Sequence, residues 1–569
     1  MINRLWQIFV DRVDPLTKIV HAPSLQSAIE KSIVNIKQIP KPFEALLFAI
    51  YSMAIIALTE EESQAELGET RAVLLARYVA ATKAALSRAR FMSSTSIVVL
   101  QALVLHILSI RDDEEPRAVW SLTGCAIRIA EGMGMGLDGT LLGRSPFETE
   151  IYRRIWWQLK MQDFRAAELA CQAKFRHFEL DETTPKKPAN ICDKDLSPAM
   201  PHALEESTKP TEMIWVMCRT EMASFAATQK VKMQKLGKTL STSDEYSAMD
   251  QLAVKDGFIK QLEDVMETKY IRFCDPTNPL QLMTVLGARM ALNLIKFIAH
   301  HPRRWVNGQV SASEQTFVWD RVIQLLEQYN MIQSSPQLRC FAWNATYFIQ
   351  WHAVIHVLDT LRAEPLHQDA LKAWRLIDGL YESNCAMLLN VKKPISVAVG
   401  NLCLKASNAR AAAVVKEGNI PYQPPGYIVK LQEQRDAAKA RKASMMARRK
   451  HQENVNGSGA EVIQTNTATD VGFKAPLAFQ PTLLSNNVTN QPSQPVQQSK
   501  LLSDDAFWLT DAFNNDPLLA GEGAGDSMDV DMDAILGQDS SSDTANDGTI
   551  DWAQWDAWLA GVDAGRIGG

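Results

Sequence analysis

The chain has 569 residues, of which 46% are hydrophobic and 22% are charged, the ordinary balance of a folded protein with a large core. Its formal net charge is −6 at pH 7, which argues against general nucleic-acid affinity, because such affinity needs a basic surface. The charge is uneven: residues 501–569 carry 15 acidic side chains and one basic side chain, so the rest of the chain is net positive by about eight.

Two strongly apolar segments, residues 45–58 and 97–110, come early in the chain. Each is about 14 residues long, whereas a helix needs roughly 18–20 apolar residues to cross a bilayer. We therefore expect two buried core helices and no membrane partner. The first residues include Asp11 and Asp14 and lack a continuous apolar stretch, so they do not have the pattern of a secretory signal. We expect an intracellular protein.

Further along, apolar residues recur at helical spacing. Residues 119–133 and 280–298 place apolar side chains three and four positions apart, as amphipathic helices do. His300 and Pro302, which follow the second run, are residue types that end a helix. Alternating strand patterns are scarce throughout residues 1–425. The sequence therefore predicts an all-α fold, with a large domain of stacked helices over residues 1–425 and a disordered C-terminal region after it.

Residues 146–163 form the most informative segment. The proline at its start suits a first helical turn. Glu150 and Arg154 are four positions apart, so their side chains can pair on one helix face. The adjacent Trp156 and Trp157 bury a large area, and neighbouring arginines can stack on their rings. The pattern predicts a buried helix with an ion pair, which is a structural core signature rather than a reactive site.

No constellation for catalysis or cofactor binding emerges from the sequence. The glycines of residues 132–136 are spaced like part of a dinucleotide fingerprint, but the next required glycine is Leu137 and a helix precedes them. We expect them to end that helix. His352 and His356 share a helix face, yet Ala353 stands where a metalloprotease needs a glutamate, so packed histidines are expected. We predict no catalytic, metal-binding or cofactor-binding residues, and no enzyme.

A basic segment follows the helical domain, and we assign it to residues 426–451. It is rich in helix-favouring residues and carries two basic clusters separated by a short spacer. Such clusters suit a nuclear import signal or a patch that meets phosphate, and a solvated helical spacer is an equally weighted alternative. The candidate nuclear import residues are Lys439, Arg441, Lys442, Arg448, Arg449 and Lys450.

The last two segments differ sharply in composition. Residues 452–500 are rich in Asn, Gln, Ser, Thr and Pro and cannot bury enough apolar surface to fold, so we expect a disordered linker. Residues 501–569 interleave aromatic residues with aspartates, which is typical of an acidic activation segment; a docked C-terminal helix is the alternative. The expected anchors for a coactivator groove are Phe507, Trp508, Trp552, Trp555 and Trp558.

Residues 146–163 resemble the core of the fungal-specific transcription factor domain, whose hallmark is an acid, then arginines, a Trp-Trp pair and an Asp. The resemblance covers roughly residues 1–400. The motif residues that it carries are Trp120, Arg128, Glu150, Arg153, Arg154, Trp156, Trp157 and Asp163. Further similar segments are residues 5–23, which begin the domain in many fungal regulators, residues 118–137, the family's Pro-x-Asn…Asp loop at residues 188–196, and residues 275–303.

The chain also departs from the family pattern. Tyr152 stands where an arginine is common, and residues 166–173 lack the Ser…Gly-Arg-Pro that usually follows Asp163. Regulators of this family normally carry an N-terminal six-cysteine cluster that binds two zinc ions and reads DNA. Here the nearest two cysteines, Cys385 and Cys403, are 18 positions apart, and zinc sites need tight local pairs. We expect a chain without that cluster, or else an incomplete gene model, with its cysteines as small buried residues.

The resemblance implies a nuclear transcription factor that regulates a set of genes, above all a secondary-metabolite biosynthetic gene cluster. Its expected partners are transcriptional coactivators, a second copy of the chain or a DNA-binding regulator, and DNA, met directly or through such a partner. The family also implies sensing of a metabolite by the helical domain. The alternative is a co-regulator or interaction protein that lacks direct DNA binding and works through a DNA-binding partner.

Overall fold

The computed structural model describes residues 1–35, 38–170, 183–240, 248–302, 311–345, 348–391, 394–416 and 423–457. Every regular element within these ranges is a helix and none is a strand, so the all-α prediction is confirmed. Residues 1–431 form one compact unit, and a second unit begins at Gln432, inside the last helix. The tail with its five proposed anchors lies outside the described residues, as does the predicted linker beyond residue 457.

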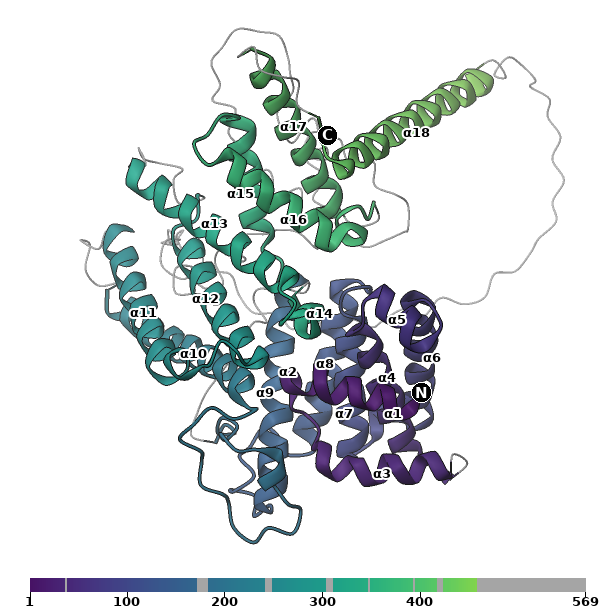
Figure 1. Ribbon diagram of the computed structural model, residues 1–569, viewed down its shortest axis with the longest axis vertical. Helices are drawn as coiled ribbons and strands as arrows, with labels where there is room; N and C mark the ends of the chain where they lie inside the picture. The colour runs from purple at the N-terminus through teal and green to yellow at the C-terminus, as the bar shows by residue number, and fades with distance from the viewer. Residues whose placement is uncertain are drawn as a thin grey trace, which may run out of the picture. The chain divides into compact units, whose positions relative to one another are not determined.

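The first half of this unit is a set of helices around one apolar core (Figure 1). Because α4 and α7 are apolar nearly all round, they pack centrally, with α6 against both and α8 beside α7. The second predicted core segment coincides with α7, and α4 covers the first as far as residue 56, so both core helices are confirmed. The helices are α1 (Ile2–Ile8), α2 (Asp14–Thr17), α3 (Ala22–Val34), α4 (Lys41–Ile56), α5 (Glu60–Leu67), α6 (Arg71–Arg88), α7 (Ile97–Ile110), α8 (Pro116–Gly132) and α9 (Pro146–Leu169), with a π-helical turn at Phe9–Val13.

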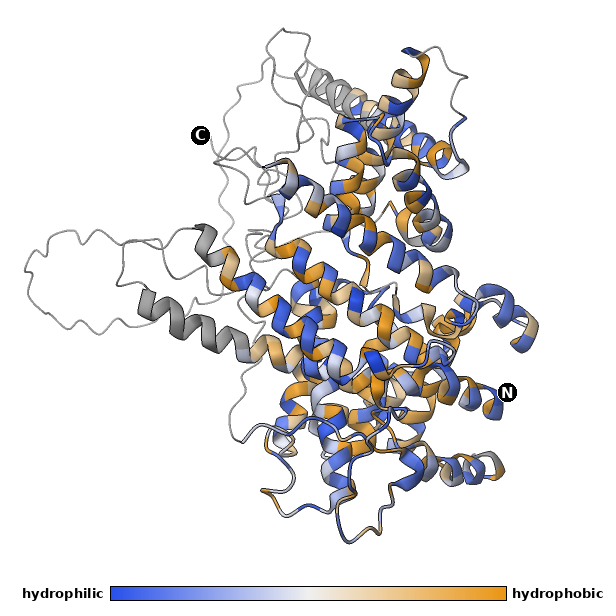
Figure 2. Cartoon of the chain, turned by 60° about the vertical axis from the view of Figure 1, so that its left-hand side comes forward, coloured by the Kyte–Doolittle hydropathy of each residue, from blue (hydrophilic) through white to orange (hydrophobic). Residues whose placement is uncertain are grey.

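The second half of the unit has its own core, in which α13 lies between α12, α15 and α16, and α15 packs on α17. A smaller core joins α10, α11 and α12. Figure 2 shows hydrophobic and hydrophilic positions alternating along the helices, as amphipathic helices in a stacked fold require. The helices are α10 (Ile214–Leu240), α11 (Ala248–Lys269), α12 (Pro279–Ala299), α13 (Ala312–Ser334), α14 (Ala342–Ala345), α15 (Trp351–Ala363), α16 (Ala370–Leu388) and α17 (Pro394–Lys416).

Two predicted helix ends are also confirmed. The helix α8 ends at Gly132, and Gly134 adopts a φ of 76°, the left-handed region that glycine enters without steric cost. The helix α12 ends at Ala299, directly before His300. Among the described helices, α12 alone is long and apolar enough to cross a membrane by length and composition. Its most apolar stretch is 61% buried inside the fold, as in a core helix.

The end of α12 carries a pH-sensitive contact. The ring of His300 lies between two carboxylates, with Nδ1 2.6 Å from Glu314 Oε1 and Nε2 3.0 Å from Asp256 Oδ1. Burial lowers the pKa of His300, but the hydrogen bonds to Asp256 and Glu314 outweigh it and raise the pKa above 6.5. Because the folded pKa is raised, this contact contributes its full stability below pH 6.5 and loses it as the pH rises through the folded value.

We therefore expect His300→Gln to lower the free energy of unfolding at about pH 6 more than at about pH 8.5. Urea denaturation at both pH values measures the difference. The exposed His202 provides the control, since His202→Gln should change the free energy of unfolding by no more than about 0.5 kcal/mol, as surface substitutions usually do. If His300→Gln lowers the free energy of unfolding equally at both pH values, the positive charge of His300 does not contribute to stability.

The last helix, α18 (Gly426–Gly457), starts in the first unit, where the Tyr427 ring stacks on Tyr381 with 4.3 Å between centroids. Helix therefore continues six residues past residue 451, the expected end of the basic segment. Lys439, Arg441 and Arg448 are exposed on it, and the side chains of the other three candidate import residues lie outside the described ones. The helical character of the segment is as expected, and its role in import stays a prediction.

Candidate functional site

The helix α9 organises the site that the sequence motif marks. Ser145 and Glu148 form a capping box at its start, each bonding the other's backbone N–H, and Pro146 occupies the first turn as predicted. The most buried charged residues of the helix are Glu150, which is 4% exposed, and Arg154, which is fully buried. A buried charge has to be paired, so the partners of these two residues define the site.

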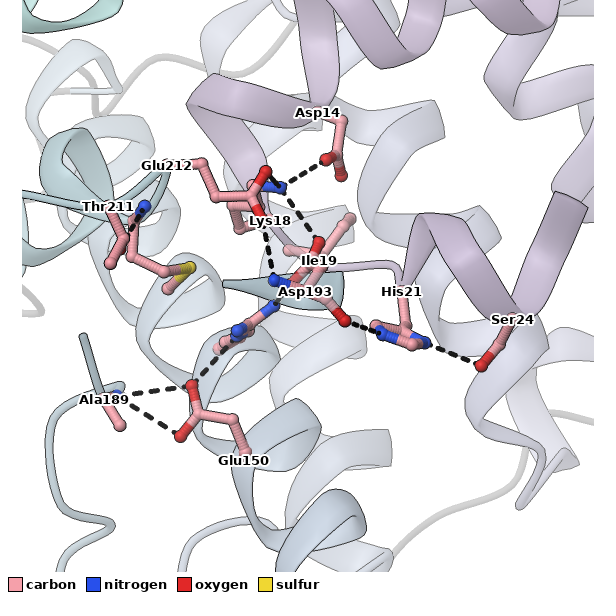
Figure 3. Close-up of polar contacts among 12 residues, drawn as sticks. Asp14, Lys18, Ile19, His21, Ser24, Glu150, Ala189, Asp193, Thr211 and Glu212 are labelled. Carbon is pink, nitrogen blue, oxygen red and sulfur yellow. Dashed lines mark hydrogen bonds and ion pairs between the residues drawn. The ribbon is translucent and has the colours of Figure 1, made fainter. Parts of the chain in front are cut away.

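Arg154 lies between two carboxylates. Its Nε is 2.9 Å from Glu150 Oε1, so the predicted pair on one helix face is present. Its Nη1 donates to Asp193 Oδ1 at 2.6 Å, although Asp193 belongs to the loop that follows α9. Both oxygens of Glu150 also accept from the backbone N–H of Ala189, as Figure 3 shows. The arginine therefore ties this loop to the middle of α9.

Lys18 is the second cation of the cluster and comes from the N-terminal segment of the chain. It has a left-handed φ of 48°, directly after α2, and is 2% exposed. Its Nζ donates to Asp14 at 2.8 Å, to Asp193 at 2.9 Å and to Glu212 at 2.8 Å (Figure 3). Because Asp193 binds both cations, it is the central residue of this network, and the N-terminal segment is joined to α9 through it.

Backbone contacts complete the arrangement around Asp193. Its N–H donates to Glu212 Oε1 at 2.7 Å. Its carbonyl oxygen accepts from His21 Nε2 at 2.8 Å, while His21 Nδ1 bonds Ser24 Oγ. Asp193 is thus held through its side chain, its N–H and its carbonyl. We call Asp14, Lys18, Glu150, Arg154, Asp193 and Glu212 the charge network.

The electrostatics of the charge network are those of a closed structural cluster. Burial raises the pKa of Asp193, but Arg154 and Lys18 outweigh it, and the pKa lies below its usual range. Burial raises the pKa of Asp14 and of Glu150, in spite of the cations beside them. Each cation points at carboxylates of the chain itself, so the geometry favours holding segments together over binding a substrate.

A second ion pair attaches the loop between α8 and α9 to α9. Arg153 makes a two-pronged contact with Asp138, at 2.8 Å through both Nε and Nη2. Asp138 also accepts from the N–H of Lys186 at 2.8 Å. The neighbouring Gly139 permits this close approach, because a Cβ there would collide with Thr149 on α9.

The two tryptophans face different surroundings, because successive residues on a helix point about 100° apart. Trp157 is 2% exposed, and its Nε1 donates to the carbonyl oxygens of Pro185 and Lys186. Trp156 instead packs against Gly136, at the exit of α8. Both rings are therefore buried, and their purely structural role stays a prediction.

The remaining motif residues lie outside the charge network. Trp120 packs against the first core from α8, and Arg128 is exposed on the same helix. Asp163 is half-buried, which raises its pKa. The departure at Tyr152 has a local explanation, because the Arg144 guanidinium stacks over its ring at 4.1 Å.

Truncating either tryptophan should destabilise the domain. We expect Trp157→Ala to lower the free energy of unfolding by about 3–5 kcal/mol, because it leaves a cavity, and Trp156→Ala to act similarly. Trp157→Phe keeps most of the apolar area and loses the Nε1–H donor, so it should cost about 1–3 kcal/mol. Urea denaturation measures all three variants. Wild-type stability of both alanine variants, combined with lost regulation, would mean that the pair is a functional contact instead of a core element.

Comparison with known proteins identifies the fold family. Residues 6–159 match the fungal specific transcription factor domain, and this segment includes the Trp-Trp motif and Lys18. The chain belongs to this family. Asp193 and Glu212, which complete the charge network, lie beyond the matched segment of the fungal-specific transcription factor domain.

Curated relatives extend the similarity to most of the chain. The aurofusarin cluster transcription factor aurR2 of Gibberella zeae is 32% identical over 427 residues, 74% of this chain and 62% of that protein. The transcriptional regulator AacuB of Aspergillus aculeatus is 29% identical over 76% of this chain and 58% of that protein. The pyriculol/pyriculariol biosynthesis cluster transcription factor 1 of Pyricularia oryzae is 34% identical over 50% of this chain and 38% of that protein. This chain therefore spans about three fifths of the length of the first two relatives.

Two features of the site could be predicted from the sequence. They are the pairing of Glu150 with Arg154 and the burial of Trp156 and Trp157. Lys18 and Asp193 lie within residues 5–23 and 188–196, which resemble the family, but the sequence indicates no role for either. It also does not predict the pairing of Arg153 with Asp138. Asp14 is four positions before Lys18, and that spacing alone could have indicated the pair. Glu212 has no comparable local signal, because its partners are distant in sequence.

Proposed function

We propose that this chain is a transcription factor that acts in the nucleus on a secondary-metabolite biosynthetic gene cluster. The observation that carries the proposal is the match to aurR2 over 74% of the chain, since that relative is named as a cluster transcription factor. The pyriculol/pyriculariol regulator, named in the same way, supports the same class of target genes. Catalysis is not part of the proposal, because the family and these relatives are transcription factors.

The parts of the chain fit distinct tasks in this proposal. The helical unit provides a rigid domain for contacts with a second copy or with another regulator. The exposed Lys439, Arg441 and Arg448 on α18 suit an import receptor, whose recognition requires accessible positive charge. Residues 501–569 supply acidic and aromatic side chains for coactivators.

A co-regulator that reaches DNA through a DNA-binding partner is the second candidate. It is favoured by the formal net charge of −6, because affinity for DNA needs a basic surface. In that case the purified chain should bind DNA weakly, with a steep salt dependence and no sequence preference. A footprint on a defined promoter at physiological salt, with no partner present, would decide against it.

The test of the main proposal is transcript profiling of a deletion strain together with chromatin occupancy of the tagged protein. We expect a contiguous set of biosynthetic genes to change expression and their promoters to be occupied. A second strain carries the six candidate import residues of α18 changed to glutamine. Nuclear exclusion of this variant, with loss of the same transcripts, is expected. Unchanged transcripts in the deletion strain would refute the proposal.

A further inference from the structure

A small cavity lies one helical turn along α9 from Arg154 of the charge network, where the two halves of the first unit meet. Its volume is about 40 Å³, enough for more than one water molecule or for a small polar group. The arginine and amide side chains that line it come from the end of α7, from α9, from α10 and from α14. They are Arg111, Gln158, Gln162, Arg165, Arg219 and Asn344.

The lining is strongly cationic. It contains three guanidinium groups, and among the described residues that line the cavity none is acidic. Arg165 is paired with Glu168 at 2.7 Å, and Arg111 donates to Asn344 Oδ1 at 3.0 Å. Arg219 makes no hydrogen bond or ion pair within the described part of the chain, and its guanidinium lies over the Trp215 ring at 5.8 Å. The Arg219 guanidinium therefore has no carboxylate partner among the described residues, although it lines the cavity.

Two buried amides in the same wall are also unsatisfied. Gln158 and Gln162 lie one turn apart on α9, and each is 4% exposed. Gln158 Oε1 and both polar atoms of Gln162 have no partner among the described residues. Buried amides nearly always have a hydrogen-bond partner, so three such atoms beside one cavity call for an occupant.

We propose that this cavity is a binding site for an oxyanion, the chemistry shared by the carboxylate of a small organic acid and by inorganic phosphate. Guanidinium groups donate in a planar fork that matches carboxylate and phosphate oxygens. The amide of Gln162 supplies a further donor, and the amide oxygens accept from a hydroxyl of the same ligand.

The surroundings of Arg219 support the same assignment. Burial, and after it the charge of Arg111, lowers the pKa of Arg219 to about 10. A bound anion would offset the repulsion between Arg219 and Arg111. Because the site joins α9 of the first core to α10 and to the segment around Trp343, its occupant would fix these elements against one another. The inference goes beyond the proposed function and does not depend on it.

The test is calorimetric titration and thermal unfolding of the full chain with sodium acetate, with sodium phosphate, and with sodium chloride at matched ionic strength. Saturable binding and a raised melting temperature with acetate or phosphate, and neither with chloride, are expected. Tighter acetate binding assigns the site to an organic acid, and tighter phosphate binding assigns it to phosphate. If neither anion binds saturably, the proposal is overturned.

Variants locate the binding. Arg219→Met should weaken it by about tenfold or more, because it removes a charged donor. The same variant should raise the melting temperature of the ligand-free protein, because it removes an uncompensated charge. Gln162→Leu should weaken anion binding without removing a charge. It replaces Arg219→Met as the test of the cavity if Arg219→Met fails to fold. Arg128→Met, at an exposed position of α8, is the control and should bind as the wild type does. Wild-type affinity of both cavity variants would place the anion elsewhere.

Discussion

Replacing Asp193 by alanine is expected to lower the free energy of unfolding by about 3–5 kcal/mol, because it removes one partner of a buried ion pair. The carboxylate of Asp193 is 2.6 Å from Arg154 Nη1 and 2.9 Å from Lys18 Nζ. Without it, both buried cations lose the acceptor that joins them. Glu150 and Asp14 each remain beside one cation, so the network separates into two parts.

Asp195 provides a matched control for this prediction. It lies in the same short 3-10 turn, two residues after Asp193, and is exposed. Asp195→Ala should change the free energy of unfolding by no more than about 0.5 kcal/mol, as surface substitutions usually do. Urea denaturation compares the two variants. If Asp193→Ala costs no more than Asp195→Ala, the charge network does not stabilise the fold.

The loss of stability in acid, compared between the wild type and Asp193→Ala, gives an independent measurement. Because the folded pKa of Asp193 is lowered, its contribution is present above its ordinary value of 3.8 and is lost as the pH falls through the folded value. Asp14 and Glu150 have raised pKa values, so they act in the opposite direction and take up protons more readily in the folded state. We expect Asp193→Ala to lose less stability than the wild type when the pH falls below 3.8.

The local part of the site was accessible from the sequence, and the long-range part was not. The pairing of Glu150 with Arg154 depends only on helical spacing, so the motif predicted it. The contacts of Arg154 with Asp193 and of Arg153 with Asp138 depend on how two loops return to α9. Sequence spacing does not predict which loop residues contact α9, because tertiary packing determines these contacts.

In the fold as well, some features could be predicted from the sequence and others depend on tertiary packing. The segments that became α4 and α7 are apolar on every side, and such helices can only be buried centrally, so their role followed from composition. The cavity beside Gln158 and Gln162 could not be predicted in this way. A glutamine on a helix is ordinarily solvated, and its burial depends on α10 and on the segment around Trp343 covering it.

The second large effect is expected in the acidic tail. Residues 501–569, fused to an unrelated DNA-binding module, should activate a reporter gene without the helical domain. The physical reason is that 15 acidic side chains repel one another and keep the aromatic residues accessible to a coactivator groove. Trp552, Trp555 and Leu559 have the spacing of one helical stripe, which suits docking of a helix formed on binding. Reporter output, normalised to the amount of fusion protein, measures the effect.

Two triple variants of this fusion separate apolar from electrostatic binding. Changing Trp552, Trp555 and Trp558 to alanine should abolish most of the activity, because a few aromatic anchors carry most of the energy of such interfaces. Changing Asp551, Asp556 and Asp563 to asparagine alters the same number of residues in the same segment. This variant should retain most of the reporter activity, since charges at an interface rim mainly affect the association rate. The reverse ranking would mean that coactivators recognise the negative charge itself. If the unmodified tail fails to activate, the tail gives the transcription-factor proposal no support, and a co-regulator acting through the helical domain becomes the better account of the chain.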